Sequence, residues 1–147
     1  MYKKLLVPVD GSELSAHAME ASIALARQLG AAIVGFVAEP DMPLPNVGTQ
    51  PVVYARQRDV HETRTDTHAH EVLAQFGELA GAAGVVFTGR HTRTDQVVAA
   101  IVDMAREQDC DMIVMVTHGR GAFGELLFGS HTKNVLSKCT IPLLVLH

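Results

Sequence analysis

The sequence has few of the residues that build disulfide scaffolds, and it has no excess of positive charge. Its 147 residues include two cysteines, Cys110 and Cys139, which form no CxxC pair. Each stands beside a predicted buried strand, so we expect two reduced, mainly apolar thiols in a cytoplasmic protein. The formal net charge of −4 argues against a general nucleic-acid binder, which needs a basic face.

Long apolar runs and recognisable catalytic motifs are also missing. The apolar run near the N-terminus stops at Pro8, which makes it too short for a signal sequence or a membrane span. We therefore expect one cytoplasmic domain over residues 1–147. No serine lies in a GxSxG motif, and no pair of carboxylates can be assigned to one site. These absences predict that the protein is not an enzyme and has no catalytic residues.

Apolar segments alternate with helical patterns along the chain. The predicted strands are 4–9, 31–38, 85–90, 112–116 and 141–146. The predicted helices begin after Ser12, near Arg56, at 94–95 and at about Ser130. Strands separated by helices indicate right-handed crossovers and a parallel sheet that helices cover on both faces.

The first helix has its own signals for a start, an end and an inner face. Ser12 is expected to cap its N-terminus, and Gly30 is expected to end it. Apolar residues at spacings of four and three form the predicted inner face. These residues are Leu14, Ala18, Ala21, Leu25 and Leu29.

Prolines interrupt the pattern between Glu39 and Val53. They sustain neither a helix nor a central strand, so we expect an irregular, mobile flap there. The helix expected next, from about Arg56 to Gly81, is polar first and apolar later. That order predicts packing chiefly through its C-terminal half.

The segment from Asp111 to Leu136 carries the strongest functional signal. An apolar strand leads into four glycines, and Gly-Ser-His-Thr then opens a helical pattern. Unpaired backbone N–H groups converge at such a helix start with the helix dipole behind them, so the segment predicts an anion site. Ligands of parallel α/β sheets bind beyond the carboxyl ends of strands where the strand order reverses. We expect the exits of the first and fourth strands, at Asp10 and 117–119, to lie there.

Two familiar phosphate motifs fit this segment poorly. Gly119 to Gly124 spells GxGxxG, but a dinucleotide site also needs an acidic residue about 20 positions later within a further βαβ unit. Gly124 to Gly129, followed by Ser130 and His131, has the spacing of a Walker A loop, but the required Lys with a following Ser or Thr is missing, since His131 and Thr132 come next and Lys133 is displaced. These mismatches argue against a dinucleotide-dependent dehydrogenase and a P-loop NTPase.

A third pattern fits better and covers the whole chain. Val-Pro-Val-Asp-Gly-Ser near the start, Thr-His-Gly-Arg-Gly and Gly-Ser around the glycine loop, and Ile-Pro-Leu-Leu-Val near the end resemble the universal stress protein family. The resemblance implies a single-domain α/β fold with an open, five-stranded parallel sheet and helices on both faces. It also implies a homodimer that forms through the last strand, Ile141 to His147.

Many members of that family bind ATP through Gly-x-x-Gly, nine residues, and then Gly-Ser or Gly-Thr. By this resemblance Gly119 is the second glycine, Gly129 and Ser130 are the closing pair, and Val116 replaces the first glycine. A valine that meets the nucleotide weakens binding by about 5- to 150-fold. A valine that points into the core has little effect, and the sequence leaves both outcomes open.

The resemblance implies an adenine nucleotide such as ATP, with Mg²⁺ arriving on its phosphates. Asp10 would face the nucleoside or, alternatively, cap the first helix, and the backbone of Val37 would contact adenine. Backbone N–H groups and hydroxyls of the loop would hold the phosphates, with Arg120 as a countercharge. The expected nucleotide-binding residues are Pro8, Val9, Asp10, Val37, Met115, Val116, Gly119, Arg120, Gly129, Ser130, His131 and Thr132.

Histidines in the long second helix form no convincing metal site. His61, His68 and His70 stand at spacings of seven and two, which do not converge on one helical face. We expect a solvated surface there and no metal. Two functions remain: a nucleotide-dependent regulatory module of the stress response, and a dimeric interaction protein of the same fold that binds no nucleotide.

Overall fold

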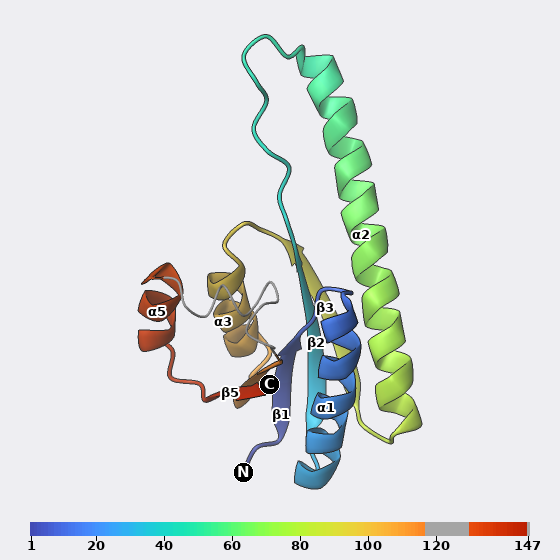
Figure 1. Cartoon of the computed structure of the whole chain (residues 1–147), viewed down its shortest axis with the longest axis vertical. Helices are drawn as coiled ribbons and strands as arrows, with labels where there is room; N and C mark the ends of the chain where they lie inside the picture. Colours follow the sequence, from blue (N-terminus) through green and yellow to red (C-terminus); the bar gives the residue numbers. More distant parts are fainter. Residues whose placement is uncertain (117–129, 147) are drawn as a thin grey trace.

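The computed structural model describes residues 1–116 and 130–146, in which parallel strands alternate with helices (Figure 1). The strands are β1 (Lys4–Pro8), β2 (Ala32–Glu39), β3 (Phe87–Arg93), β4 (Met112–Val116) and β5 (Leu143–Leu146). The helices are α1 (Glu13–Leu29), α2 (Pro51–Ala82), α3 (Val97–Glu107) and α5 (Ser130–Ser137).

The five strands form one sheet in the order β3-β2-β1-β4-β5, and every pairing is parallel. The chain first builds outward from β1 to β2 and β3, and α3 then carries it back to β4 on the other side of β1. The strand order therefore reverses between β1 and β4. This topology confirms the predicted open, five-stranded parallel sheet.

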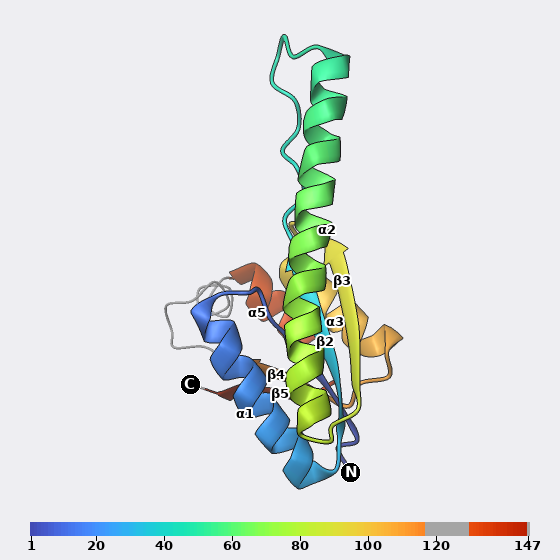
Figure 2. The ribbon, with the colours of Figure 1, turned by 90° about the vertical axis from the view of Figure 1, so that its right-hand side faces the viewer.

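Helices cover both faces of the sheet (Figure 2). Helices α1 and α2 contact one face, while α3 contacts the other and packs beside α5. Alternating residues of β4 divide between the two layers: Val114 and Val116 join the α1 and α2 side, and Ile113 and Met115 join the α3 side. All four side chains are buried, as expected for a central strand of a parallel sheet.

Helix α2 is too long for the sheet that it covers. Its 32 residues span about 48 Å, whereas the eight residues of β2 span about 26 Å. The N-terminal part of α2 therefore projects beyond the sheet, with the chain that leads into it running alongside (Figures 1 and 2). We call this projection, residues 40–64, the arm. Despite the length of α2, none of the described helices is apolar enough to cross a membrane.

The buried residues of α2 confirm that it packs through its C-terminal half. They are Thr65, Ala69, Val72, Leu73, Phe76 and Ala80. The predicted start near Arg56 is wrong, because α2 begins at Pro51. Proline suits the first helical position, where its missing N–H group would have no intrahelical partner. The irregular connection is therefore shorter than expected and covers residues 40–50.

Two other elements, β3 and α3, also begin at different residues than predicted, each later in the chain. Strand β3 covers Phe87–Arg93 rather than 85–90, because pairing with β2 continues to Glu39 opposite Arg93. Helix α3 begins at Val97, two residues later than predicted from its polar start signal. The polar residues at the end of β3 resemble loop residues in the sequence, but in the structure they pair with β2 as part of the sheet.

The inner face of α1 is rotated from the predicted one. Leu29 is 40% exposed, and Ala21 and Leu25 are half-buried. Among the side chains of α1 that the structure describes, the buried ones are Ser15, Ala18, Met19, Ser22, Ile23 and Ala26; Leu14, also predicted for the inner face, lies outside this description. The Ser22 hydroxyl can be buried because it donates to the carbonyl of Met19. Gly30 ends the helix at a φ of 66°, as predicted.

Both cysteines are free thiols, as predicted. Burial raises the pKa of Cys110 to about 11, with nearby Asp111 and Asp109 acting in the same direction and Lys4 opposing them. Cys110 is therefore neutral at physiological pH and contributes to the core as a small apolar side chain.

Candidate functional site

The exits of β1 and β4 lie side by side at the carboxyl edge of the sheet. Leu5 pairs with Met112 and Leu6 with Ile113, and continuing this register brings Val9 level with Val116. The N–H of Val9 still donates to the carbonyl of Phe36 at 2.9 Å, so the chain leaves the sheet only at Asp10. This edge is the switch point at which parallel α/β sheets bind ligands.

Asp10 and Ser15 hold the loop between β1 and α1 in shape. The Ser15 hydroxyl accepts the N–H groups of Asp10 and Gly11 at 2.9 and 3.0 Å, and it donates to Asp10 Oδ1 at 2.7 Å. Asp10 Oδ1 also accepts the N–H of Ser12 at 2.9 Å. Ser12 stands at the N-cap position but makes no side-chain cap, so the expected cap by Ser12 is wrong. Asp10 and Ser15 brace the start of α1 instead.

The same hydrogen bonds keep Asp10 ionised. Partial burial alone would raise the pKa of its carboxyl group, but the hydrogen bonds from Ser12 and Ser15 outweigh it and hold the pKa below the usual value of 3.8. Oδ2 accepts no hydrogen bond from a described residue. One oxygen of Asp10 thus braces the start of α1, as the capping alternative predicted, whereas its expected role toward a nucleoside stays a prediction.

The apolar residues predicted for the site have their side chains in the core. Pro8, Val9 and Val37 are buried at the ends of β1 and β2. Met115 and Val116 are each 4% exposed and face opposite layers of the sheet. Val116 packs in the cluster between the sheet and α1, so its side chain has the core orientation that was one of the two alternatives.

The glycine loop itself lies outside the described residues. Gly119, Arg120 and Gly129 belong to it, so their expected roles stay predictions. Helix α5 begins at Ser130, which confirms the predicted helix start after the glycines. The side chains of Ser130, His131 and Thr132 also lie outside the description, and their roles stay predictions.

An acidic residue and a histidine that were not predicted for the site also lie beside this edge. Glu39, the last residue of β2, is 9% exposed, and its Oε1 contacts Nδ1 of His68 on α2. The same imidazole lies over Gly11, where an added Cβ would stand 2.7 Å from His68 Nε2. Gly11 also has a φ of 84°, which favours glycine. The loop of Asp10 therefore packs against His68 of α2 at Gly11, where a larger residue would clash.

An ion pair joins α2 to the end of β3. Arg93 donates to Asp66 Oδ1 at 2.6 Å, and both side chains are partly exposed. Arg93 pairs in register with Glu39, so this ion pair and the contact between Glu39 and His68 are neighbours. We call these four residues, Glu39, His68, Asp66 and Arg93, the clamp. It fixes α2 at the level where the arm leaves the sheet.

The three histidines of α2 contact three different partners. His61 Nε2 lies 2.9 Å from the carbonyl of Pro40, and His70 Nδ1 lies 2.7 Å from the carbonyl of Asp66. The ring of His70 also meets that of His91 at a centroid distance of 4.9 Å. Among residues 1–116 and 130–146, no three His, Cys, Asp or Glu side chains gather as a possible metal site.

An open parallel sheet with a polar loop at its switch point defines a doubly wound α/β protein of the kind that binds small ligands at this edge. The family model that matches the chain is that of the universal stress protein family, over residues 1–147. The chain belongs to the universal stress protein family.

Individual relatives agree with this assignment. The chain is 27% identical to a universal stress protein of Methanocaldococcus jannaschii over 150 residues, which cover 99% of this chain and 82% of the relative. It is similar in structure to a universal stress protein solved in complex with cAMP, with a TM-score of 0.63, 23% identity and coverage of 99% and 97%. It is also similar to one from Archaeoglobus fulgidus in complex with dAMP, with a TM-score of 0.60, 20% identity and coverage of 99% and 98%.

Proposed function

We propose that this protein binds an adenine nucleotide at the carboxyl edge between β1 and β4, and that it acts as a nucleotide-dependent regulatory module of the cytoplasmic stress response. The observation that carries the proposal is Asp10, which stands at the switch point, ionised and with Oδ2 available. A carboxylate oxygen so placed suits a ribose hydroxyl or an adenine amino group.

The start of α5 supplies the second part of the proposed site. Ser130 opens this helix after the glycine loop, so free N–H groups and the positive end of the helix dipole suit a phosphate. ATP is the proposed ligand, with Mg²⁺ carried on its phosphates. Two structural relatives were solved with cAMP and dAMP, which supports the adenine nucleotide class. In this proposal the protein binds the nucleotide without a catalytic role.

The orientation of Val116 favours this proposal over a pocket closed by that valine. Its side chain is 4% exposed and belongs to the core cluster that also contains Val9 and Val114. We therefore expect Val116→Gly to lower stability through a lost core contact and to leave nucleotide affinity unchanged. A sharp rise in affinity would instead support the interaction protein with a blocked pocket.

We also propose that two copies associate through the free edge of β5. This strand pairs with β4 on one side, and it lies at the edge of the sheet among the described strands. Its apolar residues Leu143–Leu146 are only partly buried, and such an edge suits pairing with a second copy. Nucleotide occupancy would act by favouring one of two states of this assembly or of the 40–50 connection.

The test of nucleotide binding begins with carry-over. The gently purified protein is denatured, the supernatant is chromatographed, and ATP with Mg²⁺ is titrated calorimetrically. We expect stoichiometric binding that Gly119→Val and Gly129→Val abolish and that Asp10→Asn weakens by about 10- to 100-fold. Asp103→Asn, an exposed acid on α3, is the matched control and should bind normally. Absence of carry-over and of binding at millimolar ATP would contradict the proposal.

A further inference from the structure

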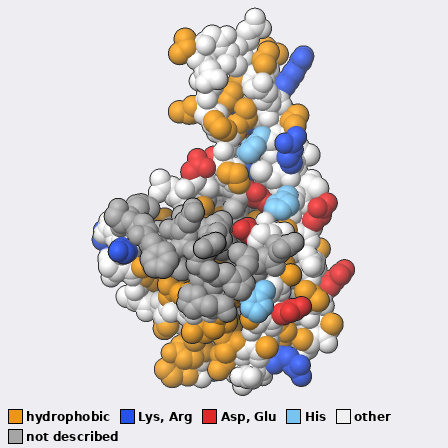
Figure 3. Space-filling model, in the orientation of Figure 1, with side chains coloured by type: hydrophobic (Ala, Val, Ile, Leu, Met, Phe, Trp, Pro, Cys, Tyr) orange, Lys and Arg blue, Asp and Glu red, His pale blue; other side chains and the backbone are white. Residues whose placement is uncertain are grey.

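The arm exposes more apolar surface than a solvated projection needs. Three valines of its helical part, Val52, Val53 and Val60, are 62%, 43% and 58% exposed. Leu44 and Val47 of the connection are almost fully exposed. Apolar side chains are accordingly visible on the projecting arm in Figure 3. Contiguous exposed apolar patches of this kind mark interaction surfaces.

The three valines lie on one side of α2. Positions 52, 53, 56, 59 and 60 are separated by one, three, four, seven and eight residues, which places them on a common helical face. We call this the docking face: Val52, Val53, Arg56, Asp59 and Val60. Valine is a poor helix former, and a helix that projects alone is marginally stable in water. Burial of the docking face would offset both costs.

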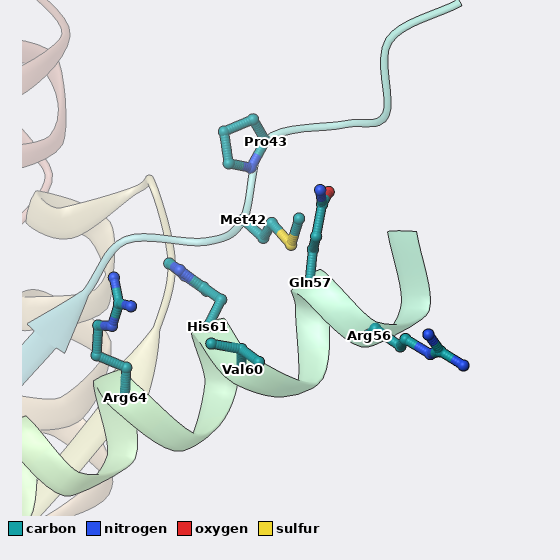
Figure 4. A pocket seen from close by; sticks show the side chains of 7 residues that line it. All are labelled: Met42, Pro43, Arg56, Gln57, Val60, His61 and Arg64. Carbon is teal, nitrogen blue, oxygen red and sulfur yellow. The ribbon is translucent and has the colours of Figure 1, made fainter. Parts of the chain in front are cut away.

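A groove extends the docking face toward the connection. It has a volume of about 430 Å³ and lies between α2 and residues 42–43. Met42 points from the connection toward α2, whereas Arg56 points away from the connection (Figure 4). The lining residues are Met42, Pro43, Arg56, Gln57, Val60, His61 and Arg64. An apolar side chain from another molecule would find methionine, proline and valine carbon atoms there.

The charges of the arm favour a second copy of the same chain as the molecule that covers the docking face. The whole chain carries a net charge of −4, but the arm has acidic and basic residues in equal number. They are Asp41, Asp59, Glu62, Arg56, Arg58 and Arg64. Neither Arg56 nor Asp59 has an ion-pair partner among the described residues. A surface with one free charge of each sign complements itself.

Twofold symmetry turns this balance into a specific arrangement. In an antiparallel pair of helices, a twofold axis level with residue 57 sets Arg56 of each copy within about 1.5 Å, along the helix axis, of the height of Asp59 of the other. The same axis brings Val60 of each copy against Val53 of its partner. The ion pair and the valine contact then each form twice, on one continuous surface.

We propose that the docking face is a homotypic interface, through which the arms of two copies pair in antiparallel orientation. This interface is separate from the β5 edge and does not depend on nucleotide binding. If both interfaces form, the protein assembles as a tetramer or a longer chain; if the arm alone pairs, it is a dimer.

The mass of the full-length protein tests the proposal, measured by light scattering after size exclusion over a range of concentrations. We expect Val60→Asp to halve the wild-type mass, because it raises the dissociation constant at least about a hundredfold by burying a charge opposite Val53. Arg56→Glu alone should weaken association about tenfold, and Arg56→Glu with Asp59→Arg should restore it. Val86→Asp, on a 73% exposed residue outside the arm, is the matched control and should keep the wild-type mass.

Cross-linking tests the register independently of mass. In a Cys139→Ser background, Val53→Cys protein is mixed with Val60→Cys protein under mild oxidation. We expect a covalent heterodimer in the mixture and little product from either protein alone, because each valine faces the other one across the axis. Mixtures with Val86→Cys are the control.

Two results would overturn the proposal. One is a wild type that stays monomeric at all concentrations, or a mass that Val60→Asp leaves unchanged. The other is a charge-reversed double variant that associates no better than Arg56→Glu alone. A β5 interface without arm pairing gives the unchanged mass, so failure here is distinguishable from failure of the proposed β5 dimer or of nucleotide binding.

Discussion

The two halves of α2 belong to one continuous helix, but the C-terminal half packs on the sheet whereas the N-terminal half projects beyond it. The C-terminal half places small and aromatic residues against the sheet, where Ala69, Phe76 and Ala80 are fully buried. The N-terminal half exposes valines and carries balanced charge. One half therefore depends on its own chain for stability, whereas the other depends on its connection and, in our proposal, on a second copy. Helix continuity alone does not indicate a common role.

Truncation of one large side chain in each half should give the sharpest contrast. Phe76→Ala removes a fully buried ring that meets Phe87 at a centroid distance of 4.9 Å, and we expect a loss of about 3–5 kcal/mol of unfolding free energy. Val60→Ala in the arm should change it by less than about 0.5 kcal/mol in dilute protein. Urea denaturation measures both. Similar losses would show that the arm belongs to the cooperative core.

An added methyl group where the C-terminal half of α2 packs on β2 should also lower the free energy of unfolding, by less than Phe76→Ala does. Gly35 of β2 lies under the ring of Phe87, where an added Cβ would stand 2.7 Å from the ring and 3.1 Å from Phe76. We expect Gly35→Ala to cost about 1–3 kcal/mol. Adding Phe87→Leu should recover part of that loss by making room. Thermal unfolding of the two variants tests this, and an unaffected Gly35→Ala protein would contradict the tight packing of α2 on β2.

Ionisation of Asp10, whose loop packs against the C-terminal half of α2, should make the free energy of unfolding depend on pH. The pKa of folded Asp10 lies below its usual value of 3.8, so its stabilising effect is present above that value and is lost as the pH falls through the folded-state pKa. Asp10→Asn should therefore be less stable than wild type by about 1 kcal/mol at neutral pH. The difference should shrink in acid below the usual value of 3.8. A difference that is constant down to strong acid would contradict the ionised, hydrogen-bonded carboxylate.

The clamp between the two halves should contribute least to global stability. Asp66 and Arg93 are 44% and 29% exposed, so we expect Asp66→Asn to cost only about 0.5 kcal/mol. Its effect should be local, as faster amide exchange near residues 62–68 with the core half unchanged. Hydrogen exchange by mass spectrometry measures this. Faster exchange throughout 69–82 would show that the clamp supports the core half as well.

The sequence predicts the sheet better than it predicts the edges of elements. Apolar strands are identified by composition, and the buried half of α2 by its spacing. Pro51 predicts a break in the helix, but it is the first helical residue. Ser12 has the residue type of a cap, but its side chain makes no cap, and Ser15 instead accepts the N–H groups of the loop residues Asp10 and Gly11. These errors share one cause: the local signal is correct, but its position depends on contacts.

The candidate site shows the same limit more strongly. Asp10 and the helix start at Ser130 could be predicted from spacing and resemblance. The pairing of Glu39 with His68 could not, because 29 positions separate the two residues and only the fold brings them together. A charged residue that ends an apolar strand was the available signal. The orientation of Val116 likewise depends on register, which the sequence left open.

The clamp holds α2 near its middle, and the N-terminal part of the helix projects from that point. About 22 Å of helix separate Asp66 from Pro51, so a tilt of about 10° at the clamp moves the start of α2 by about 4 Å. His68, which belongs to the clamp, also touches the glycine beside Asp10. The start of the arm is therefore the part of α2 that a small change of angle at the clamp would move farthest.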